Sequence, residues 1–141
     1  MESQARPRGC VPKEQENRVR KFDTGATRSS LEGKPQYEGY LSPIVIKRFG
    51  EYMLKHQTQA DGRRRDPDNW QKGIDKDSYM DSMLRHLVDV WLHHRGCGEE
   101  ATEDLEEALC ALHFNVDGYL FETLTARQVE RESQEFKEFN F

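Results

Sequence analysis

Helical spacing of apolar residues in three segments most limits what this chain can fold into. In the first segment, Ser42 stands as an N-cap and Pro43 at the first helical position, ahead of a pattern that runs to about Lys55. No strand-like alternation persists long enough to support a sheet. We therefore predict an all-α fold, a compact bundle of about four helices with a flexible N-terminal arm.

The second helical segment is expected to begin between Asp75 and Ser78 and to end at Gly96, a residue type common at helix C-termini. At about 100° per residue, its apolar stripe and a polar set fall on opposite sides of the helix. The stripe comprises Met80, Met83, Leu84, Leu87 and Trp91. The polar set comprises Ser82, His86, Asp89 and His93. We expect the polar set to face solvent unless it lines a groove.

The third helix is expected to start after Thr102, where Glu103 and Asp104 suit the positive end of the helix dipole. Two apolar faces predict burial on more than one side. The main stripe comprises Leu105, Ala108, Leu109, Leu112, Val116, Tyr119 and Leu120. The second face comprises Cys110, Phe114 and Phe121. Residues 125–141 either extend this helix or form a charged helix of their own.

The chain has room for one domain, because 141 residues can bury a single core but not two. We expect a flexible arm over residues 1–23, an all-α domain over 24–124 and a charged C-terminal helix or tail over 125–141. The net charge is −5, with +3 over residues 1–34 and −9 over residues 99–141. This acidic balance argues against a nucleic-acid polymer as partner.

Three cysteines without CxxC spacing indicate neither a disulfide framework nor a zinc site, and they suit a reducing compartment. The N-terminus lacks the apolar region of a signal peptide. No apolar run approaches the length that spans a bilayer. We therefore expect a cytoplasmic protein without a membrane partner.

Two pairs of ionisable residues share the same spacing on successive helices. His86 and Asp89 are three residues apart, as are Asp104 and Glu107. Residues at i and i+3 share a helix face, so two facing helices could gather four ligands around Mg²⁺ or Mn²⁺. Each residue also has a plainer interpretation: Asp104 as part of a helix start, and His86 and Asp89 as solvated groups. Glu107 projects toward the second apolar face, where it needs a cation, either a metal or a salt-bridge partner such as Arg85 or Lys72.

The loop from Asn69 to Gly73 combines an aromatic ring, Trp70, with a cation, Lys72. It could stack a base and contact a phosphate, or Trp70 could simply anchor the loop to the core. Glycines and cations around residues 24–34 could wrap a phosphate, but they are more typical of turns. The run Arg63 to Arg65 is typical of solvated charge.

Several short motifs follow one another between residues 24 and 122. They are Thr24-Gly25-Ala26 with Arg28, Glu32-Gly33-Lys34 with Tyr37, Asn69-Trp70 with Lys72-Gly73, Arg85-His86-Leu87, and the helix Leu105 to Phe114. In this order they resemble the phage-type dATP/dGTP diphosphohydrolase N-terminal domain family, which is related in function to MazG-like and MazZ-like nucleotide pyrophosphohydrolases. Where that family often has histidines, this chain has Asp104 and Glu107.

The resemblance implies metal-dependent hydrolysis of purine deoxynucleoside triphosphates to monophosphate and pyrophosphate, in the host cytoplasm if a phage encodes the protein. It implies Mg²⁺ or Mn²⁺ as cofactor and a homo-oligomer. The implied metal ligands are His86, Asp89, Asp104 and Glu107, with Asp104 and Glu107 as catalytic residues. The implied substrate contacts are Arg28, Lys34, Trp70, Lys72 and Arg85.

Two other hypotheses remain open from the sequence. A non-catalytic protein could use the same basic loops to bind a nucleotide or to sequester a nucleotide-derived signal, without a productive metal site. A helical interaction protein could instead bind a basic partner through its acidic C-terminal part. Ionisable groups gathered on inward faces would favour the enzyme.

Overall fold

The computed structural model describes residues 19–139, and the chain divides between Leu41 and Ser42 into two compact units. Most of the predicted arm over residues 1–23 lies outside the described residues. The division differs from the expected domain start at residue 24, because residues 24–41 group with the N-terminal unit.

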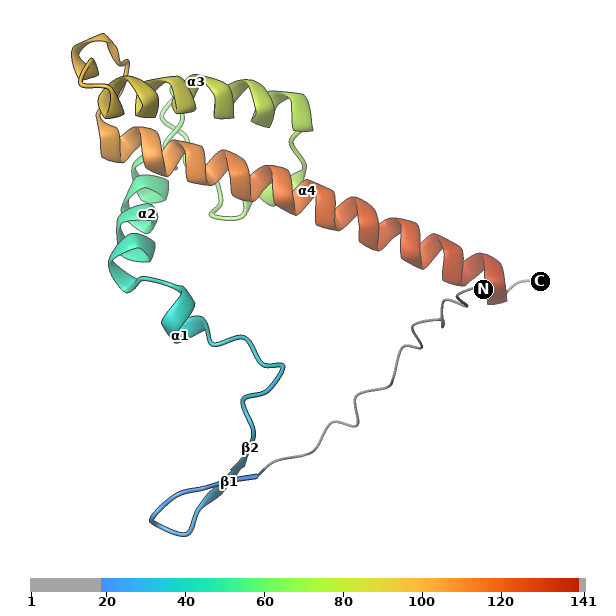
Figure 1. Ribbon diagram of the computed structural model, residues 1–141. Helices are drawn as coiled ribbons and strands as arrows, with labels where there is room; N and C mark the ends of the chain where they lie inside the picture. The colour runs from blue at the N-terminus through green and yellow to red at the C-terminus, as the bar shows by residue number, and fades with distance from the viewer. Residues whose placement is uncertain (1–18, 140–141) are drawn as a thin grey trace, which may run out of the picture. The chain divides into compact units, whose positions relative to one another are not determined.

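The N-terminal unit contains a small hairpin that the sequence did not predict (Figure 1). Strands β1 (Val19–Lys21) and β2 (Thr27–Ser29) pair antiparallel, with Arg20 opposite Arg28. The expectation that the chain holds no sheet is wrong at this point. Strands of three residues are too short for period-two alternation to show in a sequence.

Turns account for Gly25 and Gly33 of this unit. Gly25 has a φ of +86°, a conformation that favours glycine, and its N–H donates to the carbonyl of Phe22 over 2.8 Å. Beyond the hairpin, the N–H of Lys34 donates to the carbonyl of Leu31 over 3.0 Å, and α1 (Tyr37–Tyr40) forms one helical turn. The interpretation of residues 24–34 as turns is confirmed around Gly25 and Gly33, whereas Thr27–Ser29 forms strand β2.

The second unit is built from helices, as predicted (Figure 1). Ser42 takes the N-cap position of the first helix without a side-chain hydrogen bond, and a proline follows at the first helical position. The elements are α2 (Pro43–Lys55), η1 (Asn69–Lys72), α3 (Lys76–His94), η2 (Gly98–Glu100) and α4 (Leu105–Phe139). The predicted all-α class with about four helices is confirmed.

Capping residues set the limits of α3 and α4. The carboxylate of Asp75 accepts from the N–H of Ser78 over 2.8 Å at the start of α3. Asp104 accepts in the same way from the N–H of Glu107 over 3.0 Å at the start of α4. The acidic stretch after residue 124 extends α4 and does not form a separate helix, so that α4 reaches well past the start of α3 (Figure 1).

Helices α3 and α4 pack antiparallel along much of their length. Tyr79, near the start of α3, is 1% exposed and lies against Gly118, far along α4. A Cβ at Gly118 would come within 2.2 Å of the Tyr79 ring, so this contact requires glycine. Helix α2 packs across the N-terminal half of α4, where Tyr52, Cys110 and Ala111 form a small buried cluster.

The predicted inner and outer sides of α3 are reversed. Asp89, expected to face solvent, is 7% exposed, and its carboxylate accepts from the N–H groups of Thr102 and Glu103 over 3.1 and 3.2 Å. The connection between α3 and α4 folds onto this polar side because its N–H groups need acceptors. The apolar stripe, from Met80 to Trp91, is left largely exposed.

Between residues 19 and 139, no helix has both the length and the apolar character needed to cross a membrane.

Candidate functional site

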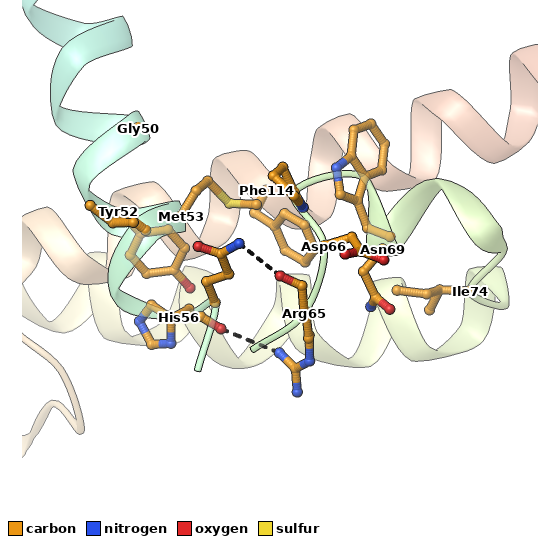
Figure 2. A pocket seen from close by; sticks show the side chains of 13 residues that line it. Gly50, Tyr52, Met53, His56, Arg65, Asp66, Asn69, Ile74 and Phe114 are labelled. Atoms are coloured by element: carbon orange, nitrogen blue, oxygen red, sulfur yellow. Dashed lines mark hydrogen bonds between the residues drawn. The ribbon is translucent and has the colours of Figure 1, made fainter. Parts of the chain in front are cut away.

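A pocket of about 580 Å³ lies between α2, the loop that follows it, η1 and α4 (Figure 2). Tyr52 and Met53 of α2 form one side, Asn69 and Ile74 the other, and Phe114 of α4 lies between them. Pockets that hold small molecules typically range from about 300 to 1,000 Å³ and are mostly apolar with a few polar groups. This pocket fits that description.

Aromatic rings give the pocket its walls. The indole of Trp70 packs edge-on against Phe114 and Phe121, with centroid distances of 6.4 and 5.0 Å. Such edge-to-face contacts hold a ring in a fixed orientation. Trp70 therefore anchors η1 to α4, as one of the two interpretations predicts, and it also lines the pocket. Stacking of a base on its ring stays a prediction.

Hydrogen bonds to Arg65 shape the loop at the rim of the pocket. The side-chain amide of Gln57 donates to the carbonyl of Arg65 over 2.7 Å, and the Arg65 guanidinium donates to the carbonyl of His56 over 3.4 Å (Figure 2). Within residues 19–139, no carboxylate pairs with Arg65. Asp66, the acid that lines the pocket, instead pairs with Lys72 over 3.4 Å. Among the lysines and arginines in the lining of this pocket, Arg65 is thus a cation without a carboxylate partner in the described part of the chain.

Tyr52 contributes a hydroxyl that stays protonated. Burial, with the nearby carboxylates of Glu103 and Glu107, raises the pKa of Tyr52 to about 12. At neutral pH its phenol can therefore donate a hydrogen bond. The ring also packs at a tilt against His56, with centroids 4.3 Å apart.

The structure separates the predicted substrate contacts. Trp70 lines the pocket. The ammonium group of Lys72 pairs with Asp66, which also lines the pocket. Arg85 is exposed on α3, where its guanidinium donates to Ser82 of the same helix over 2.9 Å. The other two predicted contacts belong to the N-terminal unit, so their part in binding stays a prediction. They are Arg28 and Lys34, of which the latter donates to Ser29 over 2.6 Å.

The predicted metal ligands each have a different partner. The ring of His86 donates from Nδ1 to the carboxylate of Glu103 over 2.9 Å. Asp89 accepts from the connection before α4, and Asp104 caps that helix, which is the plainer interpretation given above. Across residues 19–139, no group of three or more His, Cys, Asp or Glu side chains is arranged to hold a metal ion. The four residues are therefore not brought together as one ligand set, and metal binding stays a prediction.

Glu107 is held by cations of α2, whereas the sequence suggested Arg85 or Lys72. Its carboxylate, 14% exposed, accepts from Arg48 over 2.9 Å and from Lys55 over 3.0 Å. Hydrogen bonds from Lys55 and Arg48 lower the pKa of Glu107 to about 2. The charge expected among apolar neighbours is thus compensated within the protein, and it ties α2 to α4.

Sequence reasoning missed most of the pocket lining. The sequence predicts Arg65 as part of a solvated run and Phe114 as part of an apolar helix face, and both line the pocket. Arg65 itself carries no local signal, because a loop cation looks the same whether or not a pocket lies beside it. The long polar connection from Gln57 to Ile74 was the usable signal, since loops of that length in compact domains are often functional.

Comparison of the chain with protein-family models, with curated proteins and with solved structures found no match.

Proposed function

We propose that this protein binds a purine nucleotide in the pocket between α2, η1 and α4. The observation that carries the proposal is the combination of aromatic walls with an uncompensated cation, Arg65, at the rim. A nucleotide joins a flat aromatic base to an anionic phosphate chain, and each part meets a matching group. Base-to-aromatic stacking typically contributes about 1–3 kcal/mol.

The pocket also offers groups that suit the edge of a purine. The carboxamide of Asn69 lines the pocket and makes no hydrogen bond within residues 19–139. An amide can donate to N7 and accept from the exocyclic amine of adenine in a two-point contact. Gln57 is less available, because its amide already donates to Arg65 and accepts from Arg64 over 2.8 Å.

We place binding ahead of hydrolysis as the proposed function. The acids assigned to catalysis by the family resemblance have other partners: Glu107 pairs with Arg48 and Lys55, and Asp104 caps α4. Nucleotide hydrolysis with Mg²⁺ or Mn²⁺ stays a prediction of the resemblance. One experiment can separate the two activities.

Isothermal titration calorimetry of the full chain with dATP, dGTP and dCTP, first in EDTA and then in Mg²⁺ or Mn²⁺, tests the proposal. Purine nucleotides should bind more tightly than dCTP, and chromatography of the mixtures should show intact triphosphate. Absence of binding to dATP and dGTP would overturn the proposal. Release of monophosphate and pyrophosphate would instead establish the hydrolase.

Two substitutions test whether this pocket is the site. Trp70→Ala removes a stacking wall, and Arg65→Ala removes the cation, so each should raise the Kd for dATP by about 10-fold or more. Arg63→Ala is the matched control, because Arg63 belongs to the same run but does not line the pocket. Equal effects of Arg63→Ala and Arg65→Ala would mean that the basic run acts through general charge and not through the pocket.

A further inference from the structure

The apolar stripe of α3 is uncovered in the single chain. Its exposed residues range from 42% for Met80 to 63% for Trp91. The exposed stripe comprises Met80, Leu84, Leu87, Val88 and Trp91. Single apolar residues scattered over the surface are normal in soluble proteins. Five large, exposed apolar residues next to one another on one side of a helix are unusual.

Helix α4 carries a second uncovered stripe. Its members, Leu105, Leu109, Val116 and Leu120, range from 42% to 53% exposed. They recur at spacings of four and seven residues, so they occupy one side of the helix. These four belong to the main stripe that the sequence predicts to be buried; Ala108 of that stripe is buried, as predicted.

Both stripes lie on the same side of the helix pair. On each helix, the stripe begins about a quarter turn around the helix axis from the residues that face the other helix. The turn has the same sense on both helices when each is viewed from its N-terminus. Because α3 and α4 run antiparallel, the same sense of rotation brings the two stripes to one side. We call the nine residues of the two stripes the α3–α4 apolar face.

The size of this face suits association of two proteins. Nine large side chains, each about half exposed, leave roughly 900 Å² of surface, against about 800 Å² per partner in a standard interface. The largest apolar patch on a typical monomer is about 300–600 Å². All nine residues of the α3–α4 apolar face are uncharged. Two identical faces can therefore pack against each other without burying a charge.

We infer that two copies of the chain associate through the α3–α4 apolar face. The α3–α4 pairs of the two copies then form a four-helix arrangement with an apolar centre, which a closed two-fold pairing allows. The polar side of α3 and the pocket lined by Trp70 stay outside this contact. The inference is independent of the proposed nucleotide binding.

Sedimentation velocity of the full chain, from about 1 to about 100 μM, tests the inference. We expect a dimer that dissociates on dilution. Leu84→Glu and Leu120→Glu each place a charge in the contact and should raise the dimer dissociation constant by about 30-fold or more. Ile46→Glu is the matched control, because Ile46 is an equally exposed apolar residue on α2 and should leave the constant unchanged.

Circular dichroism checks that these variants, changed only at exposed positions, keep their helices. A monomeric wild-type chain over the whole range would overturn the inference. So would a dimer that Leu84→Glu and Leu120→Glu leave intact.

Tryptophan fluorescence gives a second measurement, because Trp70 and Trp91 are the two tryptophans of the chain. In a Trp70→Phe variant, Trp91 alone reports on the α3–α4 apolar face. Its emission should shift to shorter wavelength, and its quenching by acrylamide should weaken, as the dimer forms. Trp91 that stays fully accessible to acrylamide in a dimeric sample would show that another surface makes the contact, and would overturn the inference.

Discussion

The two sides of α3 differ in burial: the polar side is covered by the protein and the apolar side is exposed. The polar side is packed: Asp89 is buried, and the ring of His86 is bound to Glu103. The apolar side, which includes Leu84 and Trp91, is about half exposed. The difference shows that an apolar stripe along one helix does not by itself tell which side the rest of the chain covers. Polar side chains can be buried when they accept hydrogen bonds from the backbone N–H groups of a loop.

Gly118→Ala should have the largest effect on the packed side. The new methyl group would overlap the ring of Tyr79, so we expect a loss of about 2–3 kcal/mol in the free energy of unfolding. Urea denaturation measures it. Gly50→Ala is the control, because nothing lies within 4 Å of its added Cβ and helix propensity should raise stability by about 0.5–1 kcal/mol. Equal effects would mean that α3 and α4 are not closely packed at this point.

Asp89→Ala, also on the packed side of α3, should lower the free energy of unfolding by an intermediate amount. It leaves the N–H groups of Thr102 and Glu103 without their acceptor, so we expect a loss of about 1–3 kcal/mol and faster hydrogen exchange at these two amides. Arg85→Ala, an exposed change on the same helix, should cost less than about 0.5 kcal/mol. Unchanged exchange at Thr102 would contradict the capping role of Asp89.

Glu107→Gln should lower the free energy of unfolding at neutral pH, and its difference from the wild type should shrink as the pH falls. The pKa of Glu107 is lowered from 4.5 to about 2 in the folded protein, so its ion pairs stabilise the fold above about pH 4.5. That stabilisation is lost as the pH falls toward 2. Unfolding measured between pH 6 and pH 2 should therefore show a shallower decline for Glu107→Gln than for the wild type.

Glu106→Gln is the control for this prediction. Glu106 also pairs with Arg48, over 2.7 Å, but its side chain is 72% exposed. Exposed ion pairs contribute little, so this variant should follow the wild-type pH profile closely. If both variants behave alike, the contact between α2 and α4 does not depend on the partly buried carboxylate of Glu107.

Local signals in the sequence predicted the helices well. Ser42, Pro43 and Gly96 marked helix ends that the structure confirms within about two residues, because capping depends on near neighbours in the chain. The hairpin of Val19–Lys21 with Thr27–Ser29 was not predicted, because strands of three residues are too short for an alternating pattern. Of the pocket, the sequence indicated the loop of Trp70 but not Arg65 or Tyr52, which join it from separate segments.

The sequence by itself determined the helical class, the limits of α2 and α3 and which residues are apolar, since each depends on spacing along the chain. The tertiary structure alone decided which side of α3 is covered and which cation meets Glu107. The reason is physical: Arg48 and Lys55 lie more than fifty residues from Glu107 in the chain. Their pairing follows from how α2 packs on α4, a choice that spacing within one helix does not encode.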